Sequence, residues 1–157
     1  MIERNTNKED IAKVINHPKV WDMVSDDLSR KPYVPSDDNV YLMDDKKLGV
    51  VEIEALNGVT CIIHIAATPK LWGKVEEFID EVLSLIFTKT RFMKIIAFIP
   101  AYNKPTIGLA EKSGMEKEGC ISRSFLKGWE LHDQLIYGLT KEKFREGILC
   151  HQQQQQQ

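Results

Sequence analysis

Hydrophobic positions recur at two different periods along the chain, and the changes of period separate helices from strands. Between residues 75 and 87 apolar side chains recur every three or four positions, which predicts a helix with one continuous buried stripe. The stripe consists of Val75, Phe78, Ile79, Val82, Leu83, Ile86 and Phe87. Shorter helical patterns follow residue 8, surround Val20 and Trp21, and cover 105–113.

Alternating or continuously apolar segments rich in Val and Ile predict the strands. They cover 40–43, 48–56, 59–67, 94–99, 115–125 and 129–140. This order predicts an α/β fold with an α+β-like mixed sheet. N-terminal helices precede an antiparallel meander, then strand–helix–strand–helix–strand, then a closing hairpin strand. We expect one domain over 1–149 and a disordered, Gln-rich tail over 150–157, since the glutamine run has no apolar face to bury.

The turn between the second and third strands sets which side chains share a face. Asn57-Gly58 is the preferred pair of a two-residue type I′ hairpin turn. That turn pairs Glu54 with Cys61 and leaves His64 on the opposite face, because successive strand side chains alternate. An apolar environment favours a core or sheet-face role for His64 over a role as base.

Composition and charge argue against several classes of function. The formal net charge is −2, from 21 basic and 23 acidic residues, so no basic excess indicates nucleic-acid binding. No apolar run reaches the roughly 20 residues of a membrane-spanning helix, and no signal-peptide pattern opens the chain. Three scattered cysteines fit a reducing compartment, and the aspartate doublets lack metal-site spacing. We therefore expect a cytoplasmic protein without a metal or membrane partner.

Two segments carry candidate chemistry. Residues 65–75, IAATPKLWGKV, form a junction of strand, loop and helix, where helix N-terminal amides favour an anion. Residues 103–119, NKPTIGLAEKSGMEKEG, begin with an Asn that either caps a helix or contacts a ligand.

These segments resemble the GNAT N-acetyltransferases. The family's N-x-A-S-x-x-L-Y/A-E-K-x-G-F-x-x-E-G pattern is matched identically or closely by Asn103, Thr106, Leu109, Glu111, Lys112, Gly114, Glu118 and Gly119. The D-x-x-x-Y spacing of its final strand is present at Asp133 and Tyr137, and Gly128 stands one position further from Asp133 than in the family's G-x-x-x-D. Pro69 and Gly73 match the acyl-CoA pyrophosphate loop. The loop departs from the family at Val75 and Glu77, where small residues normally let the backbone approach the pyrophosphate.

The resemblance implies acetyl-CoA as co-substrate and an amine-bearing small molecule or protein as acceptor. It places cofactor binding at Ile65, Ala67, Trp72, Gly73, Lys74, Val75 and Asn103. The family's usual base position falls on Cys61, so Glu54 across the hairpin is the substitute candidate, ahead of Glu52. The usual acid tyrosine falls on Ala110, which leaves Tyr137 or Tyr102 as candidates, and we take Tyr137.

A narrower resemblance is to GNAT-like proteins of short-tailed bacteriophages. It includes Asn16-His17-Pro18, the strand that carries His64, and the ending Gly138-Leu139-Thr140. It implies an alternative function without catalysis, in virion or head assembly or in host interaction, with phage structural proteins as partners and the host cytoplasm or the virion as location.

Overall fold

The alternating segments form one seven-stranded sheet in the order β1-β2-β3-β4-β5-β7-β6. This computed structural model describes residues 1–156. Its strands are β1 (Ile2–Arg4), β2 (Val40–Asp44), β3 (Gly49–Ala55), β4 (Thr60–Ala67), β5 (Lys94–Pro100), β6 (Glu116–Lys127) and β7 (Glu130–Thr140). Only β4 and β5 are parallel neighbours. The predicted mixed sheet and order of elements are confirmed.

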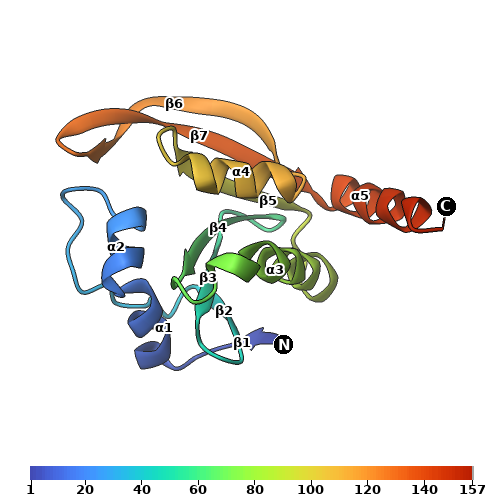
Figure 1. Cartoon of the computed structure of the whole chain (residues 1–157), viewed down its shortest axis with the longest axis horizontal. Coiled ribbons are helices and arrows are strands. Elements are labelled where there is room, and N and C mark those ends of the chain that lie inside the picture. Colours follow the sequence, from blue (N-terminus) through green and yellow to red (C-terminus); the bar gives the residue numbers. More distant parts are fainter. Residues whose placement is uncertain (157) are drawn as a thin grey trace.

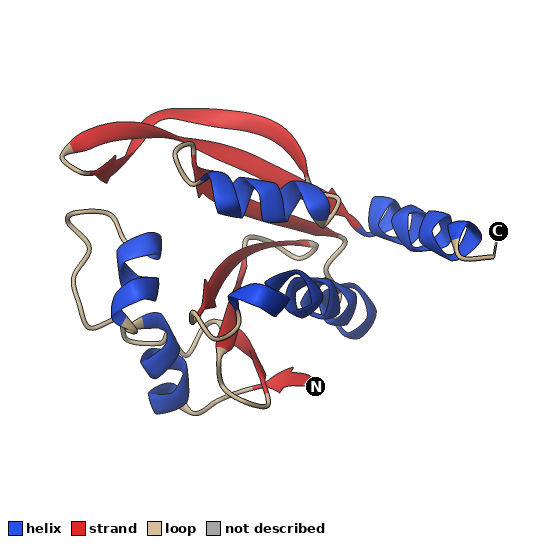
Figure 2. Cartoon of the chain, in the orientation of Figure 1, coloured by secondary structure: helices blue, strands red, loops and turns tan. Residues whose placement is uncertain are grey.

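Helices cover both faces of this sheet (Figures 1 and 2). They are α1 (Lys8–Ile15), α2 (Pro18–Val24), α3 (Val75–Lys89), α4 (Lys104–Lys112) and α5 (Lys141–Gln154), with a short 3-10 turn at Trp72–Lys74. The larger core joins α3 and α4 to one face of the sheet. The smaller core joins α1 and α2 to the other face, through Val50 and Ala66.

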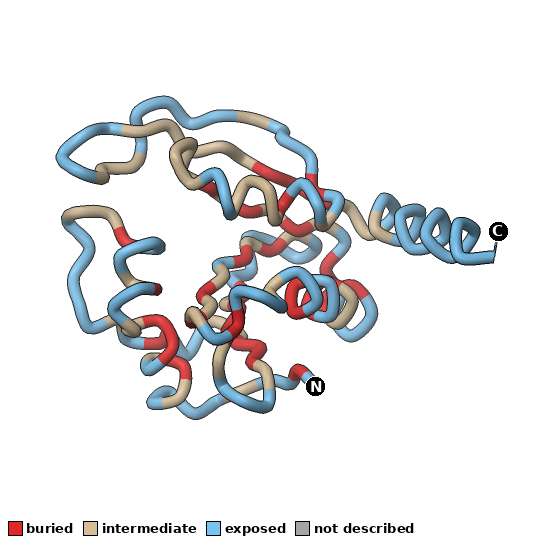
Figure 3. Tube along the Cα trace, in the orientation of Figure 1, coloured by how far each residue is buried: buried red, intermediate tan, exposed pale blue. Residues whose placement is uncertain are grey.

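The predicted stripe on α3 is the centre of the larger core, as the buried segments in Figure 3 show. Phe78, Ile79, Val82, Leu83, Ile86 and Phe87 are all buried. Val75, at the first position of the helix, is half-buried and packs against the same core. The helix therefore holds the preceding loop firmly against the sheet.

The register of the β3–β4 hairpin differs from the prediction by one residue. Glu52 pairs with His64, and Glu54 pairs with Ile62. The predicted type I′ turn is wrong, because neither Asn57 nor Gly58 has a positive φ. Instead the Asn57 side chain accepts hydrogen bonds from the amides of Val59 and Thr60, both at 2.9 Å, and closes a longer loop.

This shift moves His64 to the other face of the sheet, because side chains alternate along a strand. His64 therefore lies on the same face as Glu52 and Glu54, beside α1 and α2 rather than in the larger core. Cys61, predicted opposite Glu54, is buried in the larger core instead.

Helix α5 continues across the predicted boundary at residue 149. Thr140 caps its start by accepting a hydrogen bond from the Lys143 amide at 3.2 Å, and residues 150–154 are exposed helix where we expected an irregular tail. The helix extends away from the sheet (Figure 1), and near its start Phe144 packs on Phe87. Glutamine is a good helix former, which explains the extension. The division into a domain and a tail stays a prediction, and Gln157 lies outside the described residues.

Candidate functional site

The two parallel strands at the centre of the sheet separate part-way along their length. Residues 60–62 of β4 pair with 94–96 of β5. Beyond that point β4 stays paired with β3 as far as Ala67, while β5 stays paired with β7 as far as Pro100. Residues 63–67 of β4 therefore have no strand partner on their β5 side. The backbone there is available to a ligand lying between the strands.

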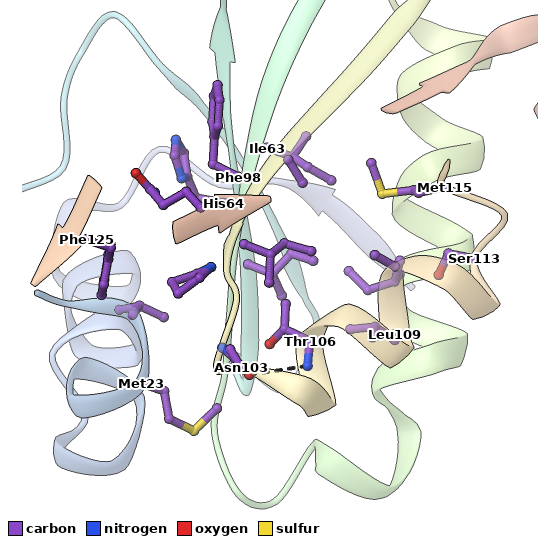
Figure 4. A pocket seen from close by; sticks show the side chains of 18 of the residues that line it. Met23, Ile63, His64, Phe98, Asn103, Thr106, Leu109, Ser113, Met115 and Phe125 are labelled. Carbon is purple, nitrogen blue, oxygen red and sulfur yellow. Dashed lines mark hydrogen bonds between the residues drawn. The ribbon is translucent and has the colours of Figure 1, made fainter. Parts of the chain in front are cut away.

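A cavity of about 450 Å³ occupies this separation. Figure 4 shows side chains from β4, β5 and α4 converging on it, with Met23 and Phe125 on one side and Ser113 and Met115 on the other. Ile63 comes from the α3 face of the sheet and His64 from the α1 face, so the cavity reaches both faces. Its walls are mostly apolar, with polar groups from His64, Asn103, Thr106, Ser113 and Gln134.

His64 stands between this cavity and a second one. The second cavity measures about 280 Å³, lies between α1, α2 and the β3–β4 hairpin, and shares Val24, His64 and Ile65 with the first. The His64 Nε2 atom lies 3.7 Å from Glu54 Oε2. Both side chains are about half exposed, at 50% and 52%. The imidazole thus faces two adjoining spaces and has a carboxylate beside it.

Glu52 belongs to the second cavity. Its Oε1 atom accepts hydrogen bonds from the Tyr33 hydroxyl at 2.7 Å, the Asn39 amide at 2.6 Å and the Tyr41 hydroxyl at 3.1 Å. Burial raises the pKa of Tyr33 and of Tyr41, so both hydroxyls stay protonated and able to donate. The sequence pattern favoured Glu54 over Glu52 as the candidate base and indicated no role for Tyr33, because residues far apart along the chain form this cluster.

The loop between β4 and α3 is tied to both elements. The Trp72 indole Nε1 donates to the Ala67 carbonyl at 2.9 Å, and the Lys74 amide donates to the Leu71 carbonyl at 2.8 Å. The Thr68 hydroxyl is buried without a hydrogen-bond partner among residues 1–156, which leaves an unpaired polar atom at the start of the loop. No side chain caps the first turn of α3. A polar ligand would satisfy groups that the loop leaves unpaired.

Comparisons with known proteins agree with this geometry. No family model matches the chain. The chain is 26% identical over 147 residues to YokL, an uncharacterized N-acetyltransferase derived from the SPbeta prophage of Bacillus subtilis strain 168. The match covers 91% of this chain and 80% of YokL. The spermidine N-acetyltransferase of Vibrio cholerae, solved with CoA and spermine, superimposes with a TM-score of 0.73 at 18% identity, over 92% of this chain and 96% of that one.

A GNAT-family acetyltransferase from Bacillus anthracis superimposes with a TM-score of 0.57 at 24% identity, over 67% of each chain. These likenesses, together with the separated parallel strands, decide the fold. The chain has the GNAT acetyltransferase fold. The predicted resemblance is confirmed at this level.

The loop between β4 and α3 is the segment expected to hold the cofactor, and its surroundings differ in part from the expectation. Gly73 is open, since a Cβ placed there would meet nothing within 4 Å. Val75 packs against the larger core, so the crowding we expected from its side chain is directed away from the loop. Glu77 is exposed beside Lys74 in a third cavity and adds negative charge near the loop. Lys112 of α4 pairs with Glu76 at 2.5 Å.

The remaining predicted positions lie in two groups. Asn103 lines the first cavity, and its Oδ1 atom also caps α4 by accepting from the Thr106 amide at 3.3 Å, as the dashed line in Figure 4 marks. Tyr137 does not line the first cavity, although its strand partner Ala97 does, and its hydroxyl donates to Glu111 Oε1 at 2.9 Å. Burial and this hydrogen bond raise the pKa of Tyr137.

The resemblance places the family's usual base at Cys61. Its thiol is fully buried, and burial raises its pKa to about 12, so it stays protonated at neutral pH. Ala110, where the resemblance expects the family's acid tyrosine, lines the first cavity. Among residues 1–156 no cluster of three or more His, Cys, Asp or Glu side chains is arranged to hold a metal ion. None of the helices there is both long and apolar enough to cross a bilayer.

Proposed function

We propose that the protein is an acetyl-CoA-dependent N-acetyltransferase that acts on an amine. The observation that carries this proposal is the separation of β4 from β5 around the 450 Å³ cavity, with His64 at its boundary. Acetyl-CoA supplies a thioester, whose carbonyl carbon an amine attacks. The separated strands provide a site where a narrow chain lies between two edges of backbone.

The residues proposed to hold acetyl-CoA fit this arrangement. Ile65 and Ala67 lie along the open edge of β4, where the Ala67 carbonyl already accepts the Trp72 indole N–H. Trp72, Gly73, Lys74 and Val75 form the loop and first turn that would face the pyrophosphate, where Lys74 adds a positive charge. Asn103 closes the far wall of the cavity at the start of α4.

The Glu54–His64 pair is proposed to remove the proton from the amine. An ammonium has no lone pair, so a base must deprotonate it before attack. His64 lines both cavities and is placed to receive that proton, while Glu54 at 3.7 Å stabilises the resulting imidazolium. We propose His64 as the catalytic residue and Glu54 as the positioning residue. Tyr137 as general acid stays a prediction.

The acceptor is proposed to be a small amine or an amine carried by a protein. The spermidine N-acetyltransferase of Vibrio cholerae was solved with CoA and spermine, whereas the name of YokL, an uncharacterized N-acetyltransferase, gives no acceptor. Fold likeness at 18% identity does not carry a substrate from one chain to another.

Calorimetry with acetyl-CoA and CoA tests the proposal directly. We expect saturable binding of both, with adenosine monophosphate as a control that lacks the pantetheine arm and binds more weakly. Acetylation is then followed by thiol release with a panel of primary amines. Absence of binding at millimolar CoA would overturn the proposal. It would favour the alternative without catalysis in phage assembly or host interaction, which rests on Val75 and Glu77 in the loop and on Ala110 in the expected acid position.

A further inference from the structure

The second cavity contains a negative charge that acetyl transfer to a simple amine does not need. Its lining includes the indole of Trp21, the ring of Tyr33, the carboxylate of Glu52 and the imidazole of His64. Aromatic faces together with a carboxylate are a combination that binds organic cations. The cavity shares the lining residue His64 with the first one, and acetyl transfer is proposed to occur at this side chain.

Glu52 is held in one orientation by its neighbours. Three donors converge on Oε1, from Tyr33, Asn39 and Tyr41. The two tyrosine hydroxyls also contact each other at 2.9 Å, and the Ser36 amide donates to the Tyr41 hydroxyl at 2.9 Å. A carboxylate fixed in this way keeps its charge in one place at little entropic cost when a ligand arrives.

The charge of Glu52 is not balanced within the described chain. Ion pairs elsewhere join lysines to Asp10, Asp22, Asp37, Glu76, Glu116 and Glu118, and none of those between residues 1 and 156 includes Glu52. All three of its hydrogen bonds reach Oε1. The second carboxylate oxygen therefore remains for a donor from outside the chain.

The reacting amine is a poor partner for such a charge. A fixed carboxylate stabilises an ammonium, whereas the nucleophile must lose its proton to attack a thioester. A second cationic group, which keeps its proton throughout, gains from the carboxylate without slowing the reaction. Glu52 and His64 are direct cross-strand partners, so their Cβ atoms lie about 5 Å apart. The two groups of the acceptor would then be joined by a short chain.

We propose that Glu52 binds a second cationic group of the acceptor and so selects small diamines over monoamines. This rests on the proposed acetyl transfer, which leaves the nature of the amine open. In this arrangement one nitrogen stays protonated between Glu52 and the rings of Trp21 and Tyr33. The other reaches His64, loses its proton and accepts the acetyl group, and the CoA thiolate leaves and takes up a proton.

Two probes that differ only in the second amine test the proposal: 1,4-diaminobutane and butylamine. We expect kcat/KM for the diamine to exceed that for butylamine by about tenfold to a hundredfold, the value of a hydrogen bond to a charged group. Glu52→Gln keeps the size and the hydrogen-bond acceptor of the side chain but removes the charge, so it should bring the two values within about threefold. Asp38→Asn removes one charge from the nearby exposed loop and should leave the ratio unchanged.

Binding measured without turnover separates failure of this proposal from failure of the proposed function. The CoA-bound protein is titrated with 1,4-diaminobutane and followed by nuclear magnetic resonance. The Trp21 indole signal should shift in the wild type and much less in Glu52→Gln. Thermal melting checks that the variant folds. Three results would overturn the role of Glu52. They are equal kcat/KM for the two amines in the wild type, a preference for the diamine that Glu52→Gln retains, and an unshifted Trp21 signal on addition of the diamine to protein that binds CoA. Loss of CoA binding would instead overturn the proposed acetyl transfer.

Discussion

Replacement of His64 and of Glu54 should reduce turnover by very different amounts. A positioned general base contributes roughly 10²- to 10⁴-fold to a rate, so His64→Gln should lower kcat/KM within that range. Glu54 acts only through the charge on the imidazolium. At 3.7 Å between side chains that are half exposed, two unit charges in a water-like medium interact by about 1 kcal/mol, and measured exposed pairs give about 0.2–1 kcal/mol.

Glu54→Gln should therefore cost at most about fivefold in kcat/KM. The loss should shrink as salt is added, because exposed charges are screened within about 8 Å at physiological ionic strength. Glu54→Asp keeps the carboxylate and should recover part of the rate. A merely structural role for Glu54 predicts neither the dependence on salt nor the partial recovery.

The assay follows steady-state thiol release at saturating acetyl-CoA while the amine concentration is varied. The series is repeated at several pH values. Calorimetry with CoA should give unchanged affinity for each variant, which assigns the loss to chemistry and not to cofactor binding. If His64→Gln turns over within about threefold of the wild type and still binds CoA, the imidazole is not the base. If Glu54→Gln costs as much as His64→Gln, the two residues act as a unit and the electrostatic reasoning is wrong.

Three further predictions concern the loop and the core beneath it. Replacing Val75 and Glu77 by Gly and Ala should tighten CoA binding by about 1–2 kcal/mol, chiefly by removing the Glu77 charge. The same change should lower the free energy of unfolding, because Val75 packs on the core and glycine is a poor helix former. If calorimetry shows no gain in CoA affinity, the loop does not hold the pyrophosphate. Gly49→Ala would bring a Cβ to 2.4 Å from Leu71 Cδ2 and 3.1 Å from Phe78 Cζ. The urea midpoint should therefore fall by the equivalent of about 1–3 kcal/mol, and CoA binding should weaken because Leu71 moves. An unchanged midpoint would show that the loop adjusts without loss of stability. Tyr137→Phe removes the donor to Glu111 and should cost about 1 kcal/mol of stability by chemical denaturation. The predicted role of Tyr137 as general acid requires in addition that kcat falls by about a hundredfold or more with CoA binding intact, and an unchanged kcat would remove that role.

Short-range sequence patterns predicted most of the helices and strands and much of the fold. The stripe from Val75 to Phe87 determined α3, because a helical period with seven apolar positions has no other way to bury its side chains. The Asn103–Gly119 segment and the order of elements led to the GNAT resemblance. Asn103 as a helix cap was also readable, since a side-chain oxygen at that position satisfies an unpaired helix amide.

The register of the β3–β4 hairpin was beyond the reach of the sequence pattern. Asn57 has two ways to close a turn, through its backbone in a two-residue loop or through its side chain in a longer one, and residues 56–59 alone do not choose between them. Packing of Val51, Ile53 and Ile63 into the larger core makes that choice. A shift of one residue then moves His64 from one face to the other.

The sequence by itself determined helices α1 to α4, strands β2 to β7 and their order, because those depend on contacts between residues close along the chain. Helix α5 was not predicted. Only the tertiary structure decided where the chemistry lies. Tyr33, Asn39 and Tyr41 meet Glu52 across 19, 13 and 11 positions, and His64 reaches both cavities only after β4 separates from β5. Such a site consists of contacts that exist only when distant segments pack, so no local period or spacing encodes it.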